Sequence, residues 1–122
     1  MKLRFRGNGL RLRLSRGEVR RLASGAALEE RVLFPGDARM GYILEPSPDA
    51  SPRASFQNGV IRISAPEVFI QPWAAGDTIG IYFDLPADGA ALQIAIEKDL
   101  ECIDAPPEER EPDAFPRLGQ SC

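Results

Sequence analysis

Four arginines near the start of the chain have the type and spacing to bind anions. In the segment LRFRGNGLRLRLS, basic residues alternate with apolar ones at Arg4, Arg6, Arg11 and Arg13. Because the side chains of a strand alternate between its two faces, the four guanidinium groups are expected to share one face, opposite an apolar one. Guanidinium groups bind phosphate through paired hydrogen bonds. The row is therefore a candidate surface for a small anion, a phosphorylated ligand or nucleic acid.

A solvated strand face is the alternative interpretation of this row. No aromatic residue is expected on the arginine face, which therefore lacks the stacking platform of proteins that bind single-stranded nucleic acid. A sequence pI near 5.0 and a formal net charge of −3 also argue against an autonomous nucleic-acid-binding protein. The expected partner is an unknown protein or a small anionic ligand.

The charged residues are divided between the two ends of the chain. Residues 1–21 contain eight basic residues and one acidic residue, a net charge of +7, whereas residues 97–113 contain eight acidic and two basic residues, a net charge of −6. In the segment IAIEKDLECI, a second alternating row consists of Glu97, Asp99 and Glu101. If the first and last strands are neighbours, this acidic row can pair with the arginines and help to set the register of the strands.

In the same segment, Lys98 alternates with the acidic residues and is expected on the inward face with Ile94 and Ile96. A lysine at such a position either extends its ammonium group to the rim of the core or binds an anion inside a pocket. In the second case, a ligand site would lie at the junction of the two halves of the chain, near Lys98 and the N-terminal arginines.

Metal binding and nucleophilic catalysis have little support in the sequence. The chain has no histidine and only two cysteines, Cys102 and Cys122. A closed zinc site needs four ligands, so Cys102 is a metal ligand only with help from distant groups, and we expect no metal and no cofactor. A nucleophilic cysteine or serine usually needs a histidine base, and no phosphate-binding loop or nucleophile-elbow motif is present. The sequence does not exclude general acid or base catalysis by Glu97, Asp99 or Glu101.

The two halves of the chain share an order of signals, which predicts the elements that position these residues. Residues 2–45 and 54–100 each contain Asn-Gly between alternating apolar residues, then Ser-x-x-Glu, then a glycine. Asn-Gly is typical of a two-residue hairpin turn, although the first one, in GNG, also allows a bulge in one long strand. Further hairpins are predicted around the PGD and PADG turns. Each half therefore predicts the order ββαββ, with 46–53 as a linker.

Two short helices are predicted from the two Ser-x-x-Glu capping boxes, which begin at Ser15 and Ser64. Pro72 is expected to end or kink the second helix before Trp73. The second helix, EVFIQPW, is almost wholly apolar, so it is either buried between layers or, if exposed, marks a protein-binding surface. The aromatic residues expected in the core are Phe69, Trp73, Tyr82 and Phe83.

Together these elements predict one α+β, β-rich domain over residues 1–104 of the 122-residue chain. We expect about eight antiparallel strands, as a closed or nearly closed barrel or a two-layer sheet, with two short helices and a tandem ββαββ pseudo-repeat. Residues 105–122 form an acidic, proline-rich tail that is expected to be extended or disordered, anchored by Phe115. No apolar run approaches the roughly 18 residues of a membrane span, so we expect no membrane partner and a cytoplasmic location.

The start KLRFRGNGLRLRLS..EV, the segment IEKDLECI and the tail sequence DAFP resemble a family of small uncharacterised bacterial proteins, a domain of unknown function. The resemblance covers nearly the whole chain. It departs at Leu100, where the family pattern has an aromatic residue, and at Arg117, where the pattern has asparagine. It implies a bacterial origin and no known activity, and no functional residue is transferred from it.

The sequence therefore favours an uncharacterised, non-enzymatic binding or protein-interaction module. The alternative is a small-anion or phosphorylated-ligand binding protein, which could be an enzyme. Its candidate anion-binding residues are Arg4, Arg6, Arg11, Arg13 and Lys98.

Overall fold

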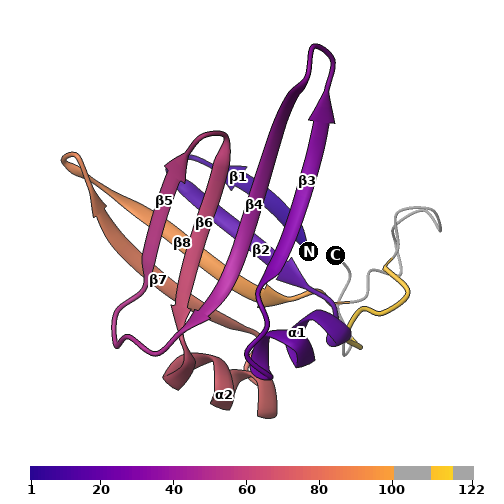
Figure 1. Ribbon diagram of the computed structural model, residues 1–122. Helices are drawn as coiled ribbons and strands as arrows, with labels where there is room; N and C mark the ends of the chain where they lie inside the picture. Colours follow the sequence, from indigo (N-terminus) through magenta and orange to yellow (C-terminus); the bar gives the residue numbers. More distant parts are fainter. Residues whose placement is uncertain (101–110, 117–122) are drawn as a thin grey trace.

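The computed structural model (Figure 1) describes residues 1–100 and 111–116 and contains eight strands and two helices. The first half of the chain forms β1 (Lys2–Arg6), β2 (Gly9–Leu14), α1 (Arg16–Ala23), β3 (Leu28–Phe34) and β4 (Ala38–Ser47). The second half forms β5 (Arg53–Gln57), β6 (Val60–Pro66), α2 (Glu67–Ala75), β7 (Gly80–Ala87) and β8 (Ala90–Lys98). Each half therefore has the order ββαββ. In the part of the chain described, no helix is long and apolar enough to cross a membrane.

The strands form two four-stranded sheets, with the orders β1-β2-β8-β7 and β3-β4-β6-β5. Each sheet joins a hairpin from the first half to a hairpin from the second half. The hairpins are antiparallel, but β2 runs parallel to β8 and β4 runs parallel to β6. The prediction of antiparallel strands was wrong at these two junctions, because no turn connects the paired strands and fixes their direction. Neither sheet closes into a barrel within the described residues, so the arrangement is two-layered (Figure 1).

The core lies between the two sheets and is closed at one end by the two helices (Figure 1). The central strands contribute Leu12, Leu14, Leu44, Ile61, Ile63, Ile94 and Ile96. The helices contribute Val19, Leu22, Ile70 and Trp73. Complete burial of one such side chain stabilises the fold by about 1.5–3 kcal/mol. The apolar residues of β2 and β8 therefore point into the core, and the residues that alternate with them face solvent.

Helix α1 begins as predicted from its capping box. The backbone N–H of Glu18 donates to Ser15 Oγ at 3.3 Å, and the backbone N–H of Ser15 donates to Glu18 Oε1 at 2.9 Å. Both bonds satisfy N–H groups that a helix terminus otherwise leaves unpaired. The first capping prediction is confirmed.

Helix α2 begins two residues later than its capping box predicts. Strand β6 continues to Pro66, which is the N-cap residue and makes no side-chain capping bond. The Ser64 hydroxyl instead donates to Glu45 Oε1 at 2.9 Å across the sheet. The two N-cap residues, Ser15 and Pro66, are 51 residues apart, whereas the serines of the two predicted capping boxes, Ser15 and Ser64, are 49 residues apart. The start of the second helix is therefore displaced by two residues. The prediction of a Ser64 cap was wrong because cross-strand pairing of β6 outcompetes the local cap.

Pro72 lies inside α2 and does not end it, since the helix continues through the buried Trp73 to Ala75. The last turn of the helix is completed by a hydrogen bond from the N–H of Gly76 to the carbonyl of Pro72, at 3.0 Å. Of the two effects expected of Pro72, the end of the helix before Trp73 was therefore wrong.

Residues 111–116 lie against the start of α1 and the end of β8. The N–H groups of Arg16 and Gly17 donate to the carbonyl and the carboxylate of Asp113, at 3.1 and 2.9 Å. The N–H of Phe115 donates to the carbonyl of Asp99 at 2.7 Å, and its ring packs against the core. Phe115 thus anchors this part of the tail. Glu101, Cys102 and Cys122 lie outside the described residues.

Candidate anion-binding face

The solvent-exposed face of the β1-β2-β8-β7 sheet, called the arginine face below, consists of three cross-strand rows. From β1 to β7, the first row is Lys2, Arg13, Glu97 and Gly80. The second row is Arg4, Arg11, Ala95 and Tyr82. The third row is Arg6, Gly9, Gln93 and Asp84. The register of the sheet thus brings all four predicted arginines to one face, with β7 on its far side.

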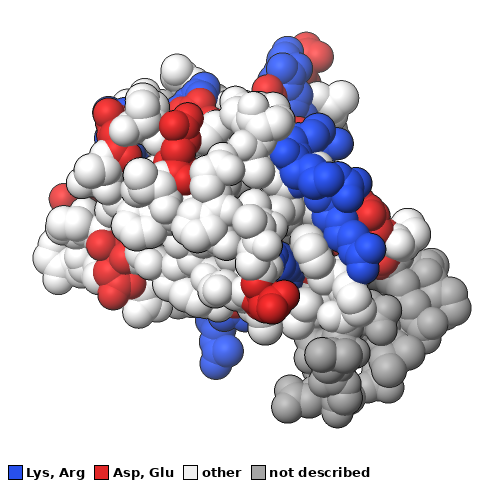
Figure 2. Space-filling view, turned by 90° about the horizontal axis from the view of Figure 1, so that it is seen from below, with Lys and Arg blue, Asp and Glu red and all other residues white. Residues whose placement is uncertain are grey.

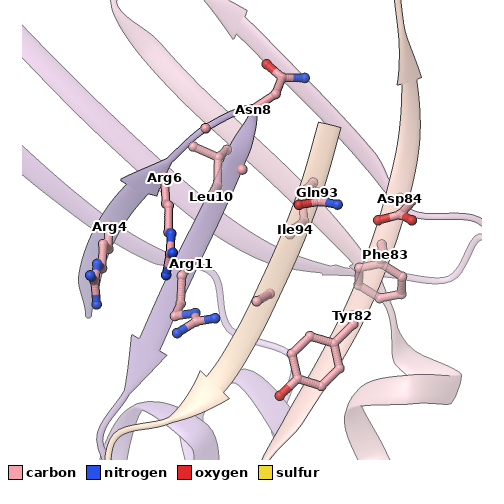
Figure 3. Close-up of a pocket in the computed structure, with 13 residues that line it drawn as sticks. Arg4, Arg6, Asn8, Leu10, Arg11, Tyr82, Phe83, Asp84, Gln93 and Ile94 are labelled. Carbon is pink, nitrogen blue, oxygen red and sulfur yellow. The ribbon is translucent and has the colours of Figure 1, made fainter. Parts of the chain in front are cut away.

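A hollow of about 480 Å³ lies on this face, over the second and third rows. Arg4, Arg6 and Arg11 line one side, and Tyr82 and Asp84 line the other (Figure 3). The floor between them is low because Gly9 and Ala95 carry little or no side chain. A Cβ atom at Gly9 would lie 3.0 Å from the carbonyl oxygen of Arg6 and 3.4 Å from that of Gln93. A side chain at Gly9 would therefore crowd the backbone, and its absence keeps this part of the floor low.

The acidic row compensates only part of the basic row. Glu97 Oε1 lies 3.3 Å from Arg11 Nε and 4.0 Å from Arg13 Nε. Asp99 pairs with Lys2 Nζ at 2.7 Å rather than with an arginine. Arg4 and Arg6 are exposed, and neither has an ion-pair partner among the described residues. Two guanidinium groups at the hollow are therefore available to an external anion.

Tyr82 was expected in the core, but 61% of it is exposed, and it lines the hollow. Its hydroxyl donates to Glu97 Oε2 at 2.7 Å. This hydrogen bond, together with partial burial, raises the pKa of Tyr82 above its ordinary value of 10.0. The expectation was wrong because Ile81 and Phe83 take the inward parity of β7. The alternation in GIYFDL was the signal that could have placed Tyr82 outward.

Lys98 lies on the inner face of the sheet, opposite the arginine face. It stands beside Leu14, is only 7% exposed, and donates from Nζ to the carbonyl of Gly76 at 2.7 Å. Its ammonium group also lies over the rings of Trp73 and Phe115, 5.9 and 5.6 Å from their centroids. A cation is favoured there because Gly76 is the C-cap of α2. The five predicted anion-binding residues therefore do not form one site, and Arg13 also lies outside the lining of the hollow.

A second basic group lies on α1, away from the hollow. Figure 2 views the molecule from the side of the helices and shows Lys and Arg side chains gathered in one band. The exposed basic residues of α1 are Arg16, Arg20 and Arg21. None of these three residues lines the hollow.

The N-terminal amine of Met1 forms a charge cluster with Glu18 and Glu30, at 3.0 Å from Glu30 Oε1. Burial alone would raise the pKa of Glu18, but hydrogen bonds with the amine and with Ser15 lower it below 4.5. Burial would lower the pKa of the amine, but hydrogen bonds to both carboxylates raise it above 8.0. The cluster ties β1 to α1 and β3, so its role is structural. Over residues 1–100 and 111–116, no group of three or more His, Cys, Asp or Glu side chains could hold a metal ion.

The model of the Family of unknown function (DUF7009) matches residues 1–118. The chain belongs to this family. The match extends over both sheets and both helices, and it confirms the resemblance to a family of unknown function. No curated protein and no solved structure matches the chain. Family membership assigns no activity to the chain.

Proposed function

We propose that this protein is a non-enzymatic binding module whose arginine face binds the phosphate groups of a small ligand. The observation that supports this most is the pair Arg4 and Arg6, which stands beside Arg11 at an open hollow without a partner carboxylate in the described structure. Guanidinium groups form strong, charge-assisted hydrogen bonds with phosphate oxygens. The volume of about 480 Å³ suits a small ligand.

The chemistry of the face favours binding over catalysis. The chain contains no histidine. Tyr82 is the titratable group at the hollow with a shifted pKa, and that pKa is raised. A catalytic base works best when its pKa lies near the operating pH, whereas Tyr82 stays protonated and acts as a hydrogen-bond donor. The face can therefore hold and orient an anion, with Tyr82 as a hydrogen-bond donor rather than a base.

Isothermal titration with inorganic tripolyphosphate tests this proposal. We expect binding to the wild-type chain and binding at least about tenfold weaker to the Arg4→Gln/Arg6→Gln variant, because hydrogen bonds to charged groups contribute about 1.5–3 kcal/mol each. Arg39→Gln is the matched control, since Arg39 is an exposed arginine on the other sheet. Equal affinities of the wild-type chain and the double variant would contradict the proposal.

The β3–β4 hairpin supports a second candidate function, that of a protein-binding module. The hairpin extends beyond the other strands (Figure 1), and its exposed apolar residues are Val32, Leu33 and Phe34. Exposed apolar groups that gather in one place are typical of protein-interaction surfaces. A pull-down that compares the wild-type chain with Leu33→Lys tests this role. A partner retained only by the wild-type chain would support it, and identical bound sets would contradict it.

A further inference from the structure

Tyr82 provides a fixed and open aromatic surface at the hollow. Its hydroxyl is held by Glu97, whose other carboxylate oxygen lies 3.3 Å from Arg11 Nε. The ring lies over Gly80, where a Cβ atom would come within 2.7 Å of Tyr82 Cζ. Glycine at this position therefore lets the ring rest against the strand while most of it faces solvent. The ring is ordered before a ligand arrives, which lowers the entropic cost of stacking a planar group on it.

The polar groups beside Tyr82 differ from those at the arginine end of the hollow. Asp84 follows Tyr82 on the same face of β7, and Gln93 stands opposite it on β8. In the described parts of the chain, neither side chain has a hydrogen-bond or ion-pair partner, and both line the hollow. A carboxylate repels phosphate but accepts hydrogen bonds from amino groups, and an amide both donates and accepts. The β7 side thus favours a planar, uncharged group that carries N–H donors.

The two sides of the hollow are separated by whole strand spacings. Neighbouring strands lie about 4.8 Å apart. Tyr82 on β7 and Arg11 on β2 are two strands apart, and Arg4 on β1 is three strands away. The backbones that carry Tyr82 and the arginines are therefore roughly 10–14 Å apart, and the long arginine side chains reach part of the way across. Inorganic phosphate offers only an anionic group, whereas a ligand that joins a planar group to an anionic group can contact both sides.

We infer that the arginine face binds a nucleoside di- or triphosphate whose base carries an amino group. The base stacks on Tyr82, the amino group donates to Asp84, and the phosphate groups lie on Arg4, Arg6 and Arg11 (Figure 3). In such a ligand the sugar links the base to the phosphate chain. The aromatic ring on β7 and the arginines on β2 and β1 follow the same order across the sheet. This inference rests on the proposed phosphate-binding function and specifies the remainder of the ligand.

Titration of the full chain with ATP, inosine triphosphate and tripolyphosphate tests the inference. ATP should bind at least about fivefold more tightly than tripolyphosphate, because stacking of a base on an aromatic ring is worth about 1–3 kcal/mol. Tyr82→Ala should remove this advantage, whereas Tyr82→Phe should keep most of it. Phe56→Ala removes an exposed ring from the other sheet and should change nothing. Inosine triphosphate lacks the amino group and should bind more weakly than ATP to the wild-type chain but not to Asp84→Asn.

The outcomes separate this inference from the proposal on which it rests. Equal affinity for ATP and tripolyphosphate, unchanged by Tyr82→Ala, would overturn the nucleotide and leave phosphate binding intact. Failure of every anion to bind would overturn both. Much tighter binding of a single-stranded oligonucleotide, with an affinity that falls steeply as salt rises, would overturn the assignment of a free nucleotide.

Discussion

At the residue scale, Lys98 shows how a buried cation is accommodated without a carboxylate partner among the described residues. Its ammonium group is satisfied by the carbonyl of Gly76 and by the faces of Trp73 and Phe115. These three contacts join the end of α2, the end of β8 and the docked tail segment. Lys98 therefore lies on the inner side of the sheet, away from the arginine face to which we assign the proposed ligand binding.

Lys98→Met should lower the free energy of unfolding by about 1–2 kcal/mol, because it removes a charge-assisted hydrogen bond and two cation–π contacts while it keeps most of the buried stem. Denaturant titration measures this change. Tripolyphosphate affinity should stay within twofold of that of the wild-type chain. Normal stability with lost affinity would show that Lys98 belongs to the ligand site.

The charge cluster of Met1, Glu18 and Glu30 predicts a dependence of stability on pH. The pKa of Glu18 is lowered on folding, so its contribution is present above its ordinary value of 4.5 and is lost as the pH falls through the folded-state pKa. The pKa of the amine is raised, so its contribution is present below 8.0 and is lost as the pH rises through the folded-state pKa. Unfolding free energies measured from pH 3 to pH 10 should therefore be largest between these values. Glu18→Gln should flatten both flanks of the profile, and an unchanged profile would contradict this role.

At the element scale, the two helices occupy similar places in the fold but begin by different means. Helix α1 has a reciprocal capping box, whereas α2 follows a strand that continues directly into its first turn. Pro66 suits this junction because it has no N–H to satisfy and its backbone is already extended before the helix. The stability of α2 must then come from the burial of Ile70 and Trp73 rather than from its cap.

This difference predicts that substitutions at the starts of the two helices have unequal effects. Ser15→Ala should lower the free energy of unfolding by about 1 kcal/mol, since it removes a helix cap. Glu67→Ala, which removes any side-chain acceptor, should change it by less than about 0.5 kcal/mol, as for other exposed sites without special contacts. Thermal or denaturant unfolding measures both effects. A loss of similar size at Glu67 would mean that α2 begins with the capping box that its sequence suggested.

At the scale of the whole molecule, the two halves of the chain depend on each other because they exchange hairpins. The β1–β2 hairpin pairs with the β7–β8 hairpin, and the β3–β4 hairpin pairs with the β5–β6 hairpin. Neither half contains a complete four-stranded sheet, and isolated hairpins are only marginally stable in water. The arginine face itself needs both halves, since β1 and β2 supply the arginines and β7 supplies Tyr82.

Separate chains of residues 1–50 and 51–122 should therefore each be unfolded, and the intact chain should unfold in one cooperative transition. Circular dichroism of the fragments and of the intact chain during heating measures both properties. A fragment that shows the strand signal and a cooperative transition by itself would contradict the exchange of hairpins as the basis of stability.

The sequence predicted the features that depend on neighbouring residues. The alternation in β2 placed Leu12 and Leu14 in the core, the alternation in β1 and β2 placed the four arginines on the other face, and the Ser15 cap was present as predicted. These signals are local, since strand parity and capping act over a few residues. The candidate site could thus be located in part before any tertiary structure was known.

The features that depend on pairing between distant segments were predicted poorly. Ser64 has the same local sequence signal as Ser15, but β6 pairs along its full length and Ser64 bonds to Glu45. Tyr82 reached the hollow only because β8 lies between β2 and β7. Strand order and parallel pairing are set by the packing of whole hairpins, and short sequence patterns do not encode them.

Binding of a phosphorylated ligand at the arginine face is tested most directly by two-dimensional ¹H–¹⁵N NMR of the full chain during titration with ATP. We expect the largest shifts at residues lining the hollow, in β1, β2, β7 and β8, including the side-chain Nε signals of Arg4, Arg6 and Arg11. We also expect Arg4→Gln/Arg6→Gln to reduce these shifts strongly at the same ligand concentration. Shifts confined to α1 or to the β3–β4 hairpin, or an unchanged spectrum at millimolar ATP, would contradict the proposed binding.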